Sequence, residues 1–115
     1  MAEATILLVE DEPLILLDLE FAIEDLGGQF VSTSSVAQAL AAIERADPPI
    51  DVAILDVNLG RGQTCEPVAD ELRRLGIPFI LHSGDLDRRD ETIRRLGARI
   101  IAKPASAERV VAEAF

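Results

Sequence analysis

Short apolar runs alternate along this chain with longer amphipathic segments, and that alternation limits the fold more than any other feature. Residues 5–9, 52–55 and 79–82 are apolar almost throughout, which is typical of strands buried on both faces of a sheet. Weaker strand signals cover residues 29–32 and 99–102. The helical spacing of apolar residues predicts the intervening helices at residues 13–26, 35–46, 67–75 and 87–96, and from residue 106 onward.

Strands that alternate strictly with helices favour right-handed crossovers and a parallel sheet covered by helices on both faces. We therefore expect an α/β fold, a three-layer doubly wound (βα)5 sandwich of the flavodoxin-like type, with the sheet order 2-1-3-4-5. In the first helix, Leu14, Leu17 and Phe21 are expected to share the buried face. Either Ser34 or Ser35 is expected to cap the second helix.

The length and charge of the chain limit its domain organisation and its partners. Its 115 residues fit one domain, which we place at residues 1–115. With 21 acidic residues against 11 basic ones, the formal charge of -10 argues against nucleic-acid binding, which depends on clustered Lys and Arg. No apolar stretch approaches the roughly 20 residues of a membrane span, and the N-terminus lacks a signal-peptide pattern. We therefore expect a cytoplasmic protein, and the sequence leaves its oligomeric state open.

Acidic residues follow two strands that are predicted to be neighbours in the sheet. Glu10, Asp11 and Glu12 come directly after the first strand, and Asp56 comes directly after the third. Open α/β sheets bind ligands beyond the carboxyl ends of their strands, so these carboxylates are expected to meet. Because the carboxylates repel one another and offer hard oxygen ligands, they favour a bound Mg²⁺ (or Mn²⁺) ion.

A hydroxyl and a cation are expected at the same edge of the sheet. Ser83 follows the fourth strand and Lys103 follows the fifth. Asp56 is a candidate nucleophile, since a carboxylate can accept a phosphoryl group to form an aspartyl phosphate. Lys103 and Ser83 would then stabilise the phosphoryl oxygens by charge and by hydrogen bonding. This set of residues predicts phosphoryl transfer.

Four segments in this order resemble a two-component response-regulator receiver domain. They are Ile-Leu-Leu-Val-Glu-Asp-Glu-Pro from residue 6, Ile-Leu-Asp-Val-Asn-Leu from residue 54, His-Ser-Gly from residue 82, and Lys103-Pro104. Each motif alone is weak, but the four at receiver spacing are specific and cover essentially the whole chain. The resemblance implies a phosphoprotein of a two-component system or phosphorelay, whose partner is a histidine kinase or a histidine phosphotransfer protein. It also implies signalling by phosphorylation-dependent binding of a target or service as a phosphate sink.

The resemblance assigns roles to the acidic residues and to the segment after the third strand. It implies that Asp56 is the phosphoacceptor and a metal ligand, and that Asp11 binds the metal directly. Glu10 would assist through a water molecule. Asn58 would give its backbone carbonyl to the metal, while its side chain lies at a position that tunes hydrolysis of the acyl phosphate.

The resemblance also assigns roles at the ends of the fourth and fifth strands. Ser83 matches the hydroxyl that moves toward the phosphoryl group, and Lys103 matches the lysine that pairs with it. Gly84 would keep the acyl phosphate accessible, and Asp85 lies at a position that tunes hydrolysis. The peptide bond before Pro104 is cis in many receivers, an isomer that is largely restricted to proline.

Three features depart from the usual receiver pattern. Position 100 holds Ile100, where receivers usually carry the Tyr or Phe that turns inward on activation. The loop after the phosphoacceptor reads Gly-Arg-Gly-Gln-Thr over residues 60–64 and lacks the common proline. The last helix is short, since the sequence ends at Phe115. These departures predict an altered route from phosphorylation to output.

Two other functional classes fit the same residues less well. One is a phosphorylation-independent interaction module with the receiver fold, which only Ile100 and the unusual loop favour. The other is a Mg²⁺-dependent phosphohydrolase with an aspartyl nucleophile, but such enzymes place the nucleophile after the first strand. We therefore expect no enzymatic activity other than self-phosphorylation from a phosphodonor and slow autodephosphorylation. His82 is interpreted as a packed core residue and Cys65, the only cysteine, as an ordinary thiol.

Overall fold

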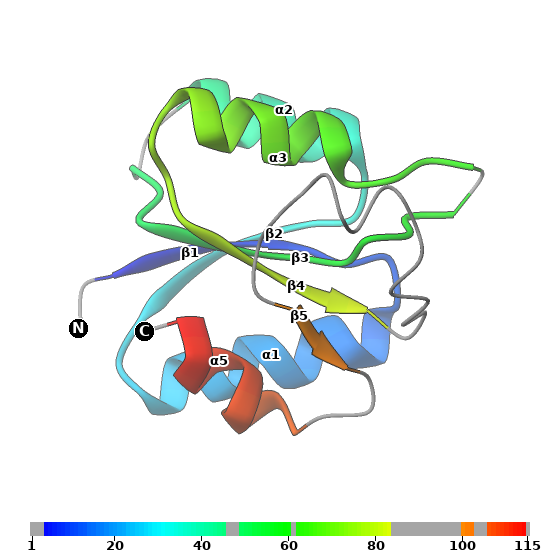
Figure 1. Ribbon diagram of the computed structural model, residues 1–115. Coiled ribbons are helices and arrows are strands. Elements are labelled where there is room, and N and C mark those ends of the chain that lie inside the picture. Colours follow the sequence, from blue (N-terminus) through cyan, green and yellow to red (C-terminus); the bar gives the residue numbers. More distant parts are fainter. Residues whose placement is uncertain (1–3, 46–48, 61, 84–99, 103–105, 115) are drawn as a thin grey trace.

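The structure, a computed structural model, describes residues 4–45, 49–60, 62–83, 100–102 and 106–114 (Figure 1). The strands are β1 (Thr5–Val9), β2 (Gln29–Thr33), β3 (Val52–Leu55), β4 (Phe79–Ser83) and β5 (Ile100–Ala102). The helices are α1 (Pro13–Asp25), α2 (Val36–Arg45), α3 (Glu66–Arg74) and α5 (Ala107–Ala114). The helix predicted at residues 87–96 lies outside the described residues. The other predicted elements are all present, with ends that differ by no more than one residue.

The five strands form one parallel sheet in the order β2-β1-β3-β4-β5, as predicted. Strand β1 pairs on both sides: Val9 is level with Thr33 of β2 and with Leu55 of β3. Because the strands are parallel and in this register, the carboxyl ends of β1, β2 and β3 lie side by side. The residues that follow β1 and β3 in sequence therefore emerge next to each other.

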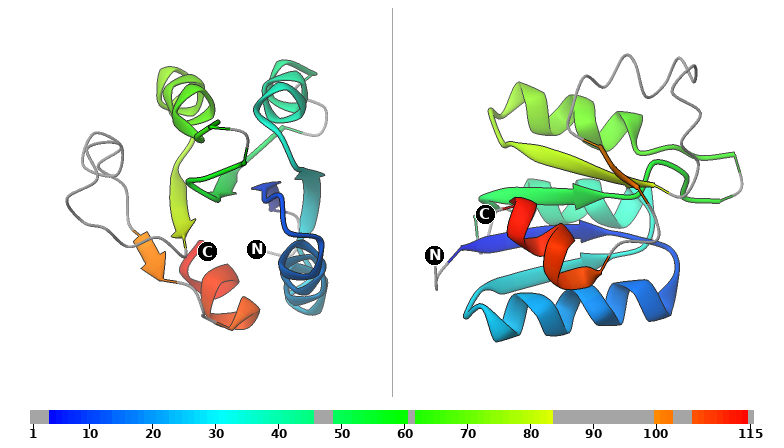
Figure 2. Two further views of the ribbon diagram at one scale, coloured as in Figure 1. Left: turned by 90° about the vertical axis from the view of Figure 1, so that its right-hand side faces the viewer. Right: turned by 60° about the horizontal axis from the view of Figure 1, so that its bottom comes forward.

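Helices cover the sheet on both faces, which makes a three-layer α/β sandwich of the flavodoxin-like class (Figure 2). Helices α2 and α3 pack on one face and α1 and α5 on the other. Alternate residues of β1 supply the two cores: Leu7 and Val9 face α2 and α3, while Ile6 and Leu8 face α1 and α5. This double coverage explains why the central strands are apolar on both sides.

The prediction for the buried face of α1 was wrong. Leu14, Leu17 and Phe21 are 77%, 44% and 57% exposed. The fully buried residues of the helix are instead Leu19, Ala22 and Ile23. Apolar residues occupy so much of the circumference of α1 that periodicity alone does not select one face. Packing against β2 and α5 makes that selection.

The predicted serine cap of α2 is confirmed and involves both candidate residues. The backbone N–H of Gln38 donates to Ser35 Oγ at 3.2 Å, and the Gln38 Oε1 accepts from the backbone N–H of Ser34 at 2.9 Å. Ser35 therefore caps the helix, and the Gln38 side chain also holds the backbone of Ser34, the residue before the cap. Among the helices that the structure describes, none combines the length and apolar composition needed to cross a bilayer.

Candidate functional site

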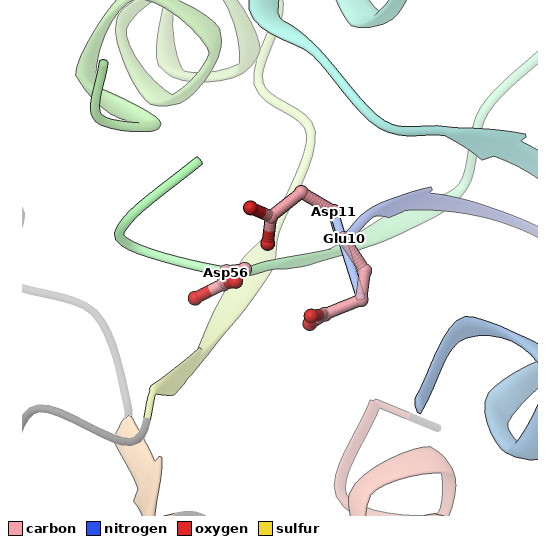
Figure 3. Close-up of side chains that lie close together, drawn as sticks. All are labelled: Glu10, Asp11 and Asp56. Atoms are coloured by element: carbon pink, nitrogen blue, oxygen red, sulfur yellow. The ribbon is translucent and has the colours of Figure 1, made fainter. Parts of the chain in front are cut away.

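Three carboxylates meet at the carboxyl edge of the sheet, as the sequence predicted. Glu10 and Asp11 follow β1, and Asp56 follows the neighbouring strand β3. One oxygen from each of the three lies within 4.8 Å of the others. Figure 3 shows the three side chains grouped around one space beyond the strand ends. These residues, far apart in sequence, therefore form one acidic cluster.

Backbone hydrogen bonds fix the positions from which these side chains emerge. The Asp56 N–H donates to the Val9 carbonyl at 2.8 Å, and the Glu10 N–H donates to the Thr33 carbonyl at 3.1 Å. The buried hydroxyl of Thr33 donates to the carbonyl of Leu8 at 2.7 Å. The sheet ladder thus continues one residue beyond the strands. Sequence reasoning missed Thr33, although its place at the end of β2 was a usable signal.

The cluster is partly buried, which strengthens the repulsion among its carboxylates. Glu10 is only 2% exposed and Asp56 only 5% exposed, whereas Asp11 is exposed to solvent. Two like charges at 4.8 Å repel by about 3.5 kcal/mol at an effective dielectric constant of about 20. A cation bound among the carboxylates would remove this repulsion. The all-oxygen donor set fits a hard divalent ion such as Mg²⁺, which takes carboxylates and retains water.

Residues 57–60 and 62–65 form a short antiparallel hairpin beside the cluster. Its hydrogen bonds run from Leu59 N to Gln63 O (3.0 Å), from Gln63 N to Gly60 O (2.9 Å) and from Cys65 N to Val57 O (3.0 Å), with an antiparallel bridge between Asn58 and Thr64. The backbone N–H of Asn58 also lies 3.4 Å from Asp56 Oδ1. The loop that departs from the receiver pattern in sequence is therefore a hydrogen-bonded structure anchored next to Asp56.

Solved structures decide the family. A response regulator receiver protein from Sinorhizobium medicae WSM419 is 25% identical and aligns over 97% of this chain and 91% of its own, with a TM-score of 0.83. SdrG from Sphingomonas melonis Fr1 is 41% identical over 99% of this chain and 94% of its own, with a TM-score of 0.79. The chain belongs to the response-regulator receiver family. No family model and no curated protein matches it.

The receiver also aligns with part of a longer protein. NtrX from Brucella abortus is 27% identical over 97% of this receiver, which covers 26% of the NtrX chain, with a TM-score of 0.81. Receivers are generally signalling modules rather than enzymes, and they act with two-component partners. The Glu10, Asp11 and Asp56 cluster is typical of the Mg²⁺ site of this family.

The structure describes only part of the remaining predicted site of this receiver. Ser83 is the last residue of β4 and pairs with Ala102, while Ile100 is the first residue of β5 and pairs with Leu81. β5 ends one residue before Lys103 in sequence. The remaining predicted site residues, Gly84, Asp85, Lys103 and Pro104, lie outside the described residues.

The single histidine and the single cysteine of the sequence are both buried in the receiver. His82 lies in β4 and is almost fully buried, in agreement with its interpretation as a packed core residue. Cys65 precedes α3 and is completely buried. Burial, together with the negative charge of Asp56, raises the pKa of the Cys65 thiol from 9.0 to about 12. Its thiol is therefore neutral and unreactive at physiological pH, as predicted.

Proposed function

We propose that residues 1–115 form one receiver domain that accepts a phosphoryl group on Asp56. The donor is the phosphohistidine of a histidine kinase or of a histidine phosphotransfer protein. The phosphorylated receiver then binds a target protein or passes phosphate out of a relay. The observation that carries this proposal is the acidic cluster: a buried Asp56 at the end of β3 lies within 4.8 Å of two further carboxylates.

The metal ligands follow from the same cluster. Asp11 and Asp56 would bind Mg²⁺ or Mn²⁺ directly, the backbone carbonyl of Asn58 would complete the protein ligands, and Glu10 would act through water. The bound ion would neutralise the carboxylates and the phosphoryl oxygens. The hydrogen-bonded hairpin supports the role of Asn58, because it holds the Asn58 backbone next to Asp56.

The transfer itself is a displacement at phosphorus. A carboxylate oxygen of Asp56 attacks the phosphoryl group, the P–N bond to the donor histidine breaks, and its electron pair returns to the imidazole nitrogen, which takes up a proton. Lys103 would pair with the phosphoryl oxygens, and the hydroxyl of Ser83 would donate a hydrogen bond to them. The burial of Asp56 strengthens both interactions, because water screens them less.

Activation would proceed without a rotating ring. Ser83 would move toward the phosphoryl group and reorder the segment that contains Gly84 and Asp85, while Pro104 shapes the backbone beyond Lys103. Ile100 opens β5 at the position of the usual aromatic switch. The variant Ile100→Tyr tests this route: partner affinity unchanged in both phosphorylation states agrees with it, and a strong phosphate-dependent change contradicts it.

Helix α1 offers a surface for the phosphodonor. Its first residue, Pro13, follows the acidic cluster by two positions, and the exposed residues Leu14, Leu17 and Phe21 form a stripe along the helix, the α1 stripe. The helix carries four acids and no basic residue. A second copy of this chain would meet like charges there. The partner surface that fits is an apolar helix face rimmed by Lys or Arg.

One experiment tests the proposed phosphoacceptor. The protein is incubated with Mg²⁺ and acetyl phosphate, and intact-mass measurement follows the added phosphoryl group, with Asp56→Asn as the control variant. We expect a Mg²⁺-dependent, hydroxylamine-sensitive adduct that Asp56→Asn does not form. An unmodified wild-type protein with a phosphorylation-independent target would favour the interaction module, and continuous turnover of a phosphate ester would favour the phosphohydrolase.

A further inference from the structure

A glycine of the β3–α3 hairpin lies against one metal-ligand candidate. Gly60 has a positive φ of 78°, and a Cβ built on it would lie 3.4 Å from Oδ2 of Asp11. Figure 3 shows Asp11 reaching over the segment that leads on from Asp56. A side chain at position 60 would therefore touch the one carboxylate of the cluster that is exposed to solvent.

A second glycine of the same hairpin provides an internal comparison. Gly62 has nearly the same backbone conformation, with a φ of 74°, but a Cβ there would meet no atom within 4 Å. A side chain at either position is disfavoured by the left-handed backbone. Only at Gly60 would the side chain also contact the acidic cluster. The two positions thus separate backbone strain from contact with Asp11.

The position of Gly60 cannot adjust freely. Its carbonyl accepts from the Gln63 N–H at 2.9 Å, and the neighbouring Leu59 donates its own N–H to the Gln63 carbonyl. The Leu59 side chain is buried in the core beneath α2 and α3. Moving the backbone at Gly60 away from Asp11 would disturb this turn and this anchor. An added methyl group would therefore stay beside Oδ2.

We propose that Gly60 is a positioning residue for the divalent cation, because its bare Cα leaves Oδ2 of Asp11 open to the ion and to the water that the ion retains. A methyl group at that distance would cover one side of the oxygen and displace water from it. The methyl group would therefore close one approach to an oxygen that the ion and its retained water need. This inference rests on the proposed metal site at Asp11 and Asp56.

The test compares Gly60→Ala with Gly62→Ala in the full chain. Isothermal titration calorimetry gives the Mg²⁺ dissociation constant without any phosphodonor, and thermal unfolding in EDTA gives the stability of the metal-free protein. We expect both variants to lose similar metal-free stability. We expect only Gly60→Ala to raise the Mg²⁺ dissociation constant, by about tenfold, as substitutions next to metal ligands do.

The outcomes separate this inference from the function on which it rests. If wild type binds Mg²⁺ but Gly60→Ala and Gly62→Ala bind it equally well, Gly60 has no positioning role and the metal site stands. If wild type shows no Asp56-dependent Mg²⁺ binding, both proposals fail. Should an alanine variant not fold, Gly60→Asn and Gly62→Asn replace the pair, since asparagine tolerates the left-handed backbone better.

Discussion

Replacing Asp56 by Asn should stabilise the metal-free receiver, even though it removes the proposed phosphoacceptor. In the folded protein, the carboxylates of Asp56, Glu10 and Asp11 lie within 4.8 Å of one another, and the first two are buried. In the unfolded chain they are separated and solvated. The native state therefore carries a repulsion that the unfolded state lacks, and an amide at position 56 removes it while keeping nearly the same shape.

The magnitude follows from the geometry. Carboxylate oxygens of the buried pair Glu10 and Asp56 lie no more than 4.8 Å apart, and at that limit an effective dielectric constant of about 20 gives a repulsion of about 3.5 kcal/mol. Asp11 is exposed, and the high dielectric constant of the surrounding water weakens its interactions, so it adds less. Allowing for partial screening of the buried pair as well, we expect a gain of about 2 kcal/mol in the free energy of unfolding. For a domain of this size that is a rise of about 8 °C in Tm.

Thermal unfolding by circular dichroism in EDTA measures this gain. Asp70→Asn serves as the control, because Asp70 lies on the exposed side of α3 and the same change of carboxylate to amide there should leave Tm nearly unchanged. Addition of Mg²⁺ should then raise the Tm of wild type more than that of Asp56→Asn. At a Mg²⁺ concentration of 100 times the dissociation constant, wild type gains about 2.7 kcal/mol.

The reasoning fails if Asp56→Asn in EDTA melts at or below the wild-type temperature. It fails equally if the Tm of both proteins rises by the same amount with Mg²⁺, since the ion would then not act at the carboxylate of Asp56.

Three further predictions concern the thiol, the hydroxyl beneath the site and the α1 stripe. Because the pKa of Cys65 is raised from 9.0 to about 12, its contribution to stability is complete below pH 9 and is lost as the pH rises toward 12. Above pH 9 the free energy of unfolding should therefore fall by about 1.4 kcal/mol per pH unit. Urea unfolding on both sides of pH 9 measures this slope, which Cys65→Ala should lack. Thr33→Val removes the hydrogen bond to the Leu8 carbonyl and should lower the free energy of unfolding by about 1 kcal/mol, whereas an unchanged urea midpoint would show that the bond contributes nothing. Leu14→Ser and Phe21→Ser should change the free energy of unfolding by less than about 0.5 kcal/mol, because both side chains are exposed. Each should slow phosphotransfer from the cognate phosphohistidine donor by about tenfold and leave the rate of phosphorylation by acetyl phosphate unchanged. Variants that match wild type with both donors would show that α1 is not part of the docking surface.

The sheet and the acidic cluster could be predicted because they depend on strong local signals and one topological rule. Strands such as β1 and β3 are short, apolar on both faces and end on acids, so their identity and their ends are legible in the sequence. Once the order placed these strands side by side, Glu10, Asp11 and Asp56 had to meet at one edge. No side-chain detail was needed for this step.

The features that the sequence did not reveal depend on packing between elements. In α1, apolar residues occupy positions 14–17, 19 and 21–23, so two overlapping stripes compete and only the contacts with β2 and α5 show that Leu19 and Ile23 are buried. The approach of Gly60 to Asp11 joins two segments nearly fifty positions apart and depends on the exact path of a hairpin. Neither spacing nor composition encodes such a distance.

The place of β1 between β2 and β3 has a consequence for synthesis of the chain. Strand β1 leaves the ribosome before both of its partners, β2 and β3, so its ladder is complete only after residue 55 has also emerged. Until then the largely apolar strand β1, followed by three acidic residues, lacks one of its two partner strands. Since Asp11 and Asp56 come together only when β1 and β3 pair, a cation that both residues bind would link these two strands and should slow amide hydrogen exchange at the β1–β3 boundary. The ion that prepares the receiver for phosphorylation would then bind only after β1 and β3 have paired.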